Sequence, residues 1–532
     1  MAEKEDTDRL ETFTFSAFRN AVKDIINVGC ILTFSICLEY LMLTVSVLFC
    51  SRFGQNEMAA VTLAQALLSL VCFVPAVGLM TVCNTYFSVG HGANLGRSQG
   101  IYIQKMVYLS IIASLICSAI LIQVDYFVLI LNKEPDVIIL VDIFVRTFIP
   151  GTLAAFLTFG LSRTLQCRNK MAVTAVAATI SLGSDVLLNY MLVYVLDMGF
   201  RGSAIAVVVA QYINCIILAV YVYKYEDLEF FSLKSLENWG EFFSIAVHGC
   251  LTLEIMQFAI VISYILAGQF GALGIAVVGA FDILAVYVYI LLIGLSSSVT
   301  ILVGQYLGKN DVKNAKITVK AAFIFLFGVA VVVGLPLLFL RDYAGYIYTD
   351  DSEIIATFSK IIPLSVVMVF SVTIEGINKA ILQAIGRQNI GTVTSLISHS
   401  CGLALSVLFA FKLDWKAIGL CAGIIFGTVI EACILLVVLM NIDFTQEAEL
   451  ALERCRVSEE EYSEIVDDEV PNGMQLNSVQ SKEKLQSDGE EESRSLIANT
   501  KYRLSKTTII IRTLNFTIPI FIFLSSLFIY LF

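Results

Sequence analysis

Acidic side chains inside long apolar stretches are the residues of this sequence that could do chemistry. They are Glu39, Asp185, Glu254, Asp282 and Glu375. If those stretches cross a bilayer, an ionised carboxylate within them is destabilising by at least about 2.5 kcal/mol. Burial favours the neutral acid, whereas an approaching cation favours the anion. One carboxyl group can therefore hold a proton or a cationic substrate but not comfortably both, and this competition is the simplest physical basis for exchange.

Glu254 and Glu375 differ in whether a basic residue of the same helix can reach them. Glu254 has no basic neighbour in its stretch, which favours a carrier of protons or cations. The alternative is a protonated carboxyl that donates a hydrogen bond between helices. Glu375 has Lys379 four residues later, which is the favourable order for an ion pair on one helix. A purely structural ion pair therefore competes with a functional role for Glu375.

The remaining candidates are a carboxyl, an acid–amide pair and two aromatic rings. Glu39 has no basic partner within a helical turn. Asp185 and Asn189 share a helix face at a spacing of four residues and could hold a proton or sodium. Tyr287 and Tyr289 could offer their ring faces to a cation. For all of these, ordinary packing or structural pairing stays open as the alternative.

Metal and cofactor chemistry finds no support in the sequence. His91, His248 and His399 are scattered, and no Cys or His pattern has the spacing of a metal site. We therefore expect no cofactor, no metal and no enzymatic activity. Glu431 is assigned to the cytosolic end of its helix and receives no function.

The elements that must position these residues are transmembrane helices. Hydrophobic residues make up 58% of the 532 residues and charged residues 15%, and the mean hydropathy is +0.83. Soluble proteins have about 45–50% apolar and 25% charged residues, so a soluble globule is excluded. A bilayer core of about 30 Å needs roughly 20 apolar residues per helix. Thirteen stretches qualify, near 25–50, 58–88, 101–124, 140–164, 172–196, 202–223, 243–268, 273–303, 317–340, 355–383, 391–411, 417–441 and 507–532.

The net charge of −11 comes mainly from one polar segment. Residues 443–505 contain 16 Asp and Glu against seven Lys and Arg. This composition is poor in aromatic residues and typical of disorder, so we expect a disordered cytosolic linker over 442–506. Residues 1–24 carry ten charged side chains and form a predicted cytosolic N-terminal segment. The chain has no basic stripe that could neutralise phosphates, which disfavours a nucleic-acid partner.

The distribution of basic residues predicts the orientation. The short loops and helix ends on the side of the N-terminus contain thirteen Lys and Arg, and those on the opposite side contain eight. Basic residues favour the cytosolic side, so the N-terminus is expected there. The C-terminus then lies outside or in a lumen after the thirteenth span, and we favour the plasma membrane over an internal one.

The sequence also repeats itself. The pairs Leu165 and Leu382, Ile149 and Ile362, Asp197 and Asp414, and Gly92 and Gly308 begin similar motifs that lie 213 to 217 residues apart. The repeat predicts an N-lobe over 25–223 and a C-lobe over 243–441, joined by a cytosolic linker over 224–242. Six helices return the chain to its starting side, so the two bundles have the same orientation, an arrangement that some transporters use. The predicted fold is all-α and polytopic, with twelve core helices in two six-helix bundles plus one C-terminal helix, which favours transport by alternating access.

Several motifs at helix ends point to a family. They are FCSRFG (49–54), AVTLA (60–64), GSAIA (202–206), VGQYLGKND (303–311) and GRQNIG (386–391). Residues 28–440 resemble the multidrug and toxin extrusion (MATE) transporters, and a thirteenth helix after a cytosolic linker is similar to their animal branch. One departure is Ser88 to Gly92, which lacks the Gln that commonly follows this Ser. The resemblance implies a monomer that exports organic cations or amphipathic compounds in exchange for protons, with sodium the less expected alternative.

The resemblance also bears on the acidic residues. The stretch around Glu254 is similar to the Cys-Leu-Glu-x-Trp-x-Phe stretch of eukaryotic members, whose Glu is their main carboxylate for protons and substrate. Here the spacing from Cys differs by two residues and no Trp follows. Asp282 lies one residue from the acid of the family, and Glu375 lies about one turn later than its counterpart. In bacterial relatives an Asn precedes an Asp, and the order of Asp185 and Asn189 is reversed.

Two other classes of function stay open. A flippase for lipid-linked headgroups predicts a lateral opening and a basic cleft. A membrane receptor or scaffold without transport predicts no flux and tolerance of substitutions at Glu254 and Glu375.

Overall fold

Long helices make up the part of the chain that the structure describes. The structure is a computed structural model, and it describes residues 15–95, 99–124, 135–226, 233–347 and 352–454. Within these ranges there is no β-strand. The predicted all-helical class is therefore confirmed. The chain divides into two units, Met1–Tyr462 and Ser463–Phe532. The second unit, with the predicted helix over 507–532, lies outside the described residues.

The first half of the chain contains six predicted spans, and helices are found at all six. They are α2 (Phe15–Cys50); α3 (Gln55–Leu68) continued through a π-helical turn (Ser69–Phe73), α4 (Val74–Leu79) and α5 (Thr81–Gly92); α6 (Gln99–Leu121); α8 (Pro135–Phe148) with α9 (Gly151–Cys167); α10 (Met171–Tyr190) with a π-helical turn (Met191–Val195); and α11 (Gly199–Tyr225). The first helix begins ahead of the predicted position 25. Between α8 and α9 the chain bends by 55°.

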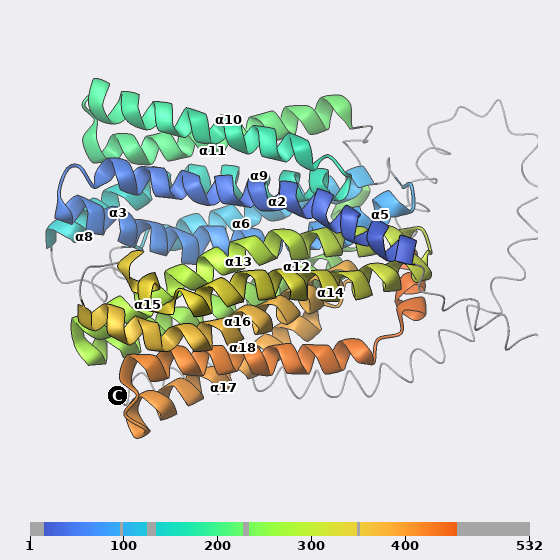
Figure 1. Ribbon diagram of the computed structural model, residues 1–532. Helices are drawn as coiled ribbons and strands as arrows, with labels where there is room; N and C mark the ends of the chain where they lie inside the picture. The colour runs from blue at the N-terminus through green and yellow to red at the C-terminus, as the bar shows by residue number, and fades with distance from the viewer. Residues whose placement is uncertain (1–14, 96–98, 125–134, 227–232, 348–351, 455–532) are drawn as a thin grey trace, which may run out of the picture. The chain divides into compact units, whose positions relative to one another are not determined.

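The second half repeats this order of helices. It contains α12 (Trp239–Ala267), α13 (Gly271–Gly308), α14 (Val312–Phe339), the short α15 (Arg341–Ala344), α16 (Ser352–Ala384), α17 (Gln388–Val407) with a π-helical turn (Leu408–Lys412), and α18 (Lys416–Met440). Eleven helices of the described residues are long and apolar enough to cross a membrane, or twelve if α8 and α9 count as one span. In Figure 1 the blue-to-teal helices of the first half lie above the green-to-orange helices of the second half.

The backbone repeats at a nearly constant offset. Residues with positive φ recur 216 or 217 positions apart. The pairs are Gly54 and Gly271, Asn94 and Asn310, Asn169 and Gly386, Asp197 and Asp414, and Gly199 and Lys416. The left-handed conformation is most often adopted by Gly, Asn or Asp, and at helix C-termini it allows a cap that satisfies the last carbonyls. The π-helical turns Met191–Val195 and Leu408–Lys412 keep the same offset. The predicted repeat is therefore present in the fold.

The two halves touch along pairs of helices that include equivalent elements. Helix α2 packs against α13, α4 against α12, and α5 against α13. The ends of α5 and α13 come so close that a Cβ at Gly92 would clash with the backbone of Gln305, and a Cβ at Gly308 with that of Val89. Because Gly92 and Gly308 occupy equivalent positions in the two halves, this contact between the halves is symmetric.

A short helix over residues 444–454 follows α18 and contacts both halves. Arg454 donates a hydrogen bond to the carbonyl of Ile385 (3.1 Å), and the hydroxyl of Tyr102 donates to the carbonyl of Arg454 (3.3 Å). Arg387 forms an ion pair with Glu447 (2.9 Å). Residues 444–454 belong to the beginning of the segment predicted as a disordered linker over 442–506, and they are helical instead. Residues 455–506 of that segment lie outside the described part.

Candidate functional site

A polar cavity of about 80 Å³ lies between the two halves. Helices α4, α5 and α9 line it from the first half, and α12, α13, α16 and α17 from the second. Its polar side chains are Thr81, Asn84, Arg163, Thr252, Tyr289, Ser296, Ser297, Thr300, Glu375, Lys379, Gln383 and Gln388. Pockets for drug-sized ligands measure about 300–1,000 Å³. This cavity must therefore widen before a compound of that size can enter.

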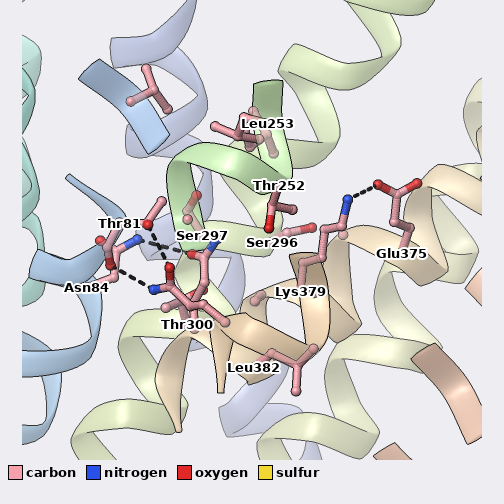
Figure 2. Close-up of a pocket in the computed structure, with 18 of the residues that line it drawn as sticks. Thr81, Asn84, Thr252, Leu253, Ser296, Ser297, Thr300, Glu375, Lys379 and Leu382 are labelled. Carbon is pink, nitrogen blue, oxygen red and sulfur yellow. Dashed lines mark hydrogen bonds and ion pairs between the residues drawn. The ribbon is translucent and has the colours of Figure 1, made fainter. Parts of the chain in front are cut away.

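Hydrogen bonds join the halves on the side of the cavity where α5, α9, α13 and α16 end, which we call the sealed side. Thr81 Oγ1 lies 2.9 Å from Gln388 Oε1, and Asn84 donates to Gln383 Oε1 (3.2 Å). Both bonds are dashed in Figure 2. The Gln305 amide donates to the carbonyl of Cys167 (2.8 Å). These bonds hold the first-half helices α5 and α9 against the second half.

The centre of the second half contains a buried ionic cluster. Lys379 Nζ lies 2.6 Å from Glu375 Oε1 and 2.8 Å from Glu431 Oε1. Ser395 Oγ donates a hydrogen bond to Glu431 (2.5 Å), and His399 Nδ1 lies 3.3 Å from the other oxygen of Glu431. The side chains of Glu375 and Glu431 are 6% and 0% exposed. The ion pair expected between Glu375 and Lys379 is present, and Glu375 also lines the cavity.

Glu254 lies on α12, the helix that packs against α4 of the first half. It is half-buried, and within the described part of the chain its Oε1 is buried without a hydrogen-bond partner. Glu254 is not among the residues that line the central cavity. It is close enough to Cys117 of α6 to act on it electrostatically. This carboxyl therefore lies at a second contact between the halves, beside the cavity.

Asp185, Asn189 and Asp282 are held by local hydrogen bonds. Asn189 donates to Asp185 Oδ1 (3.1 Å), and both residues of this pair on α10 are fully buried. Asp185 Oδ2 and Asn189 Oδ1 are buried without a hydrogen-bond partner among the described residues. Tyr264 donates to Asp282 Oδ2 (3.1 Å), which links α12 to α13. None of the three lines the central cavity.

Glu39 and the two tyrosines lie in different surroundings. Arg163 of α9 acts electrostatically on Glu39, so its cationic neighbour comes from another helix. Tyr289 lines the cavity. Tyr287 is 67% exposed and does not line this cavity, so its role as a cleft residue stays a prediction. Two residues apart on a helix differ by about 200° in direction, so the two rings cannot face one cavity.

The structure thus brings Glu375 and Tyr289 together and adds residues that the sequence did not single out. Arg163 lines the cavity, and His399 and Glu431 belong to the ionic cluster. The prediction that Glu431 marks a helix end is wrong, because it lies nine residues before the end of α18 at Met440. At 1.5 Å per residue this is about 13 Å into the helix, a depth that counting from the helix end could have revealed. In the described part of the chain no group of three His, Cys, Asp or Glu could hold a metal ion.

Comparison with known proteins decides the family. The family model described as MatE matches residues 32–191 and 250–408, one stretch in each half. The chain belongs to the MatE family. The two matched stretches of this MatE protein begin 218 residues apart, in agreement with the repeat of the backbone. Both contain membrane-length helices, so the chain is a multi-pass membrane protein.

Relatives of this MatE protein cover most of its length. Multidrug and toxin extrusion protein 1 of Oryctolagus cuniculus is 28% identical over 83% of this chain and 79% of its own. The protein of the same name from Xenopus tropicalis is 30% identical over 78% of this chain and 73% of its own. Among solved structures, the eukaryotic MATE transporter AtDTX14 superposes with a TM-score of 0.79 at 19% identity, over 82% of this chain and all of that one. The predicted resemblance is confirmed.

Proposed function

We propose that this MatE protein is a secondary active antiporter that exports organic cations or amphipathic compounds in exchange for protons. The two halves rock about the central cavity, which opens to each side of the membrane in turn. The observation that carries the proposal is Glu254, a carboxyl between the halves whose Oε1 is buried without a hydrogen-bond partner among the described residues. In support, the relatives from rabbit and frog are multidrug and toxin extrusion proteins.

The physical basis of exchange is competition for a carboxylate in a medium of low dielectric constant. An uncompensated carboxylate is unstable there, so Glu254 is occupied either by a proton or by a cationic group. We assign to Glu375 the same role at the cavity wall, and to Glu39, Asp185, Asn189 and Asp282 supporting roles in binding protons or substrate. Tyr289 offers its ring to the cation within the cavity.

The predicted orientation indicates which side of the membrane the sealed side faces. With the N-terminus in the cytosol, the ends of α5, α9, α13 and α16 face the cytosol. The hydrogen bonds of Thr81, Asn84 and Gln305 then lie on the cytosolic side of the cavity, and in this proposal they close the cytosolic entrance. In this proposal a single chain carries out the export, across the plasma membrane.

The test is uptake into proteoliposomes that are acidified inside. Tetraethylammonium is the probe, because it has no dissociable proton and cannot accumulate by ion trapping. We expect uptake that depends on the pH gradient and is lost in Glu254→Gln. The exposed Glu237 in the loop before α12 provides the matched control, and Glu237→Gln should transport like the wild type. Uptake without a pH gradient, driven by sodium, or unchanged in Glu254→Gln contradicts the proposal.

The two other classes of function have less support. A headgroup flippase calls for a basic cleft, yet one of the two cations of the cavity, Lys379, is paired with two carboxylates. The same experiment tests a scaffold without transport, because a scaffold predicts no uptake of tetraethylammonium under any gradient.

A further inference from the structure

The ionic cluster of the second half does not balance its charges. One ammonium, on Lys379, lies between the carboxyl groups of Glu375 and Glu431 at 2.6 and 2.8 Å. With both carboxyl groups ionised the three side chains sum to one negative charge. Burial of an uncompensated charge is strongly unfavourable. The cluster therefore favours the binding of one further positive charge.

The two carboxyl groups are not equally placed to receive that charge. Glu431 is fully buried, and its Oε1 accepts from both Lys379 and Ser395. Glu375 lines the cavity and has Lys379 as its partner. A proton or a substrate that arrives through the cavity meets Glu375 first. Glu431 is out of reach of the cavity and keeps Lys379 from neutralising Glu375 alone.

Two other ionisable groups lie near the cluster, on two further helices. His399 of α17 lies 3.3 Å from Glu431, and its Nδ1 also lies 3.0 Å from the carbonyl of Ser395. Tyr289 of α13 faces Lys379 and Glu375 across the cavity wall. A neutral His399 and a neutral Tyr289 leave the sum of charges at minus one.

We propose that Glu431 is a positioning residue for proton exchange at Glu375: by sharing Lys379, it keeps the cluster one positive charge short, so that Glu375 can take up a proton. This inference rests on the proposed antiport, in which Glu375 exchanges that proton for a cation. It gives Lys379 a definite part as the fixed countercharge of two acids, and it assigns a role to a residue of α18 that the sequence placed at the end of a helix.

The net charge of the cluster predicts that two substitutions change proton binding at Glu375 in opposite directions. In Glu431→Gln the cluster is neutral with Glu375 ionised, so Glu375 binds a proton less readily. In Lys379→Gln two adjacent carboxylates sum to minus two, so a proton binds more readily. In the double variant Lys379→Gln with Glu431→Gln, Glu375 stands alone at minus one, as the cluster does in the wild type. A role in packing alone has no reason to produce this order.

The experiment measures the pH of half-maximal tetraethylammonium uptake into proteoliposomes. We expect a shift of about one pH unit or more toward acid in Glu431→Gln, and a similar shift toward alkaline pH in Lys379→Gln. The double variant should return to within about half a unit of the wild type. Glu447→Gln breaks the ion pair with Arg387, and since neither residue lines the cavity, this variant should not move the profile.

A second measurement separates this inference from the antiport itself. The infrared carbonyl stretch of protonated carboxyl groups is followed during pH titration of the purified full-length protein, with Glu375→Gln identifying the signal of Glu375. The same opposite shifts are expected there without any transport. Shifts in one direction for both single variants, or none, overturn the inference even if uptake depends on pH. Uptake that does not depend on pH overturns the antiport, and the infrared shifts then decide the role of Glu431 alone.

Discussion

The two halves of this MatE protein repeat the same backbone but not the same buried chemistry. Residues with positive φ and π-helical turns recur 216 or 217 positions apart. At that offset, the residues of the charged cluster correspond to uncharged ones. Thr158, Ser162 and Asn214 lie 217 positions before Glu375, Lys379 and Glu431. All three are buried, so the first half has the same interior position without the charge.

The converse holds for the acid of the first half. Asp185 and Asn189 correspond to Gly402 and Ser406 at the same offset, and Asp185 is paired with an amide rather than with a cation. The repeat determines which positions meet inside each bundle, and the residue types determine which bundle holds charge. We therefore expect proton exchange to depend more on the second half, because Asp185 in the first half is paired with an amide.

The largest expected difference between the halves is in stability. Lys379→Met leaves two buried carboxylates without a cation and should lower the free energy of unfolding by about 3–5 kcal/mol. The loss should be greatest at alkaline pH and should shrink as pH falls, because protonation of one carboxyl group relieves the repulsion. The equivalent Ser162→Ala should cost less than about 1 kcal/mol. Thermal unfolding in detergent at several pH values measures both, and equal losses would remove the distinction between the halves.

Where the halves are equivalent, their variants should be equally affected. Gly92→Ala and Gly308→Ala each place a Cβ against the backbone of the opposite half. Each should lower the free energy of unfolding by about 1–3 kcal/mol, as expected for overpacking. Thermal unfolding checks this prediction, with Gly328→Ala as the control because no atom lies within 4 Å of a Cβ there. A loss at only one of the two glycines would contradict a symmetric contact.

Transport should depend more on the acid of the second half than on that of the first. Glu375→Gln leaves Lys379 paired with Glu431 and removes the exchangeable charge, so uptake driven by the pH gradient should fall about tenfold or more, equivalent to about 1.4 kcal/mol. Asp185→Asn preserves the shape of a pair outside the cavity and should lower uptake less than about threefold. Initial rates of uptake in matched proteoliposomes measure both effects. The reverse order would transfer charge exchange to the first half.

The smallest effect is expected at the tyrosines of α13. Tyr289→Leu removes a ring from the cavity wall and should weaken tetraethylammonium uptake by about 0.5–2 kcal/mol in apparent affinity. Tyr287→Leu alters an exposed ring and should change it by less than about twofold. The concentration dependence of uptake provides the comparison. An equal effect of both would mean that the cavity in this state is not the substrate route.

Much of the fold could be predicted from the sequence, because hydrophobic length and repeated motifs are local signals. The pairing of Glu375 with Lys379 was also local, at four residues on one helix. The meeting of Glu375 with Glu431 and His399 was not, because three helices bring them together and their rotation about their axes is set by packing. Even within the repeat, similar motifs differ. Pro150 precedes Gly151 and a bend of 55°, whereas Pro363 precedes Leu364 inside a continuous α16, consistent with the low helix propensity of glycine.

The most direct test of exchange follows protons as the substrate enters. Proteoliposomes containing this MatE protein and a pH-sensitive dye are loaded at acidic pH, and tetraethylammonium is added outside. We expect the lumen to become alkaline as the cation enters, and we expect Glu254→Gln and Glu375→Gln to abolish this response. Entry of the cation with no change in lumenal pH would contradict this expectation.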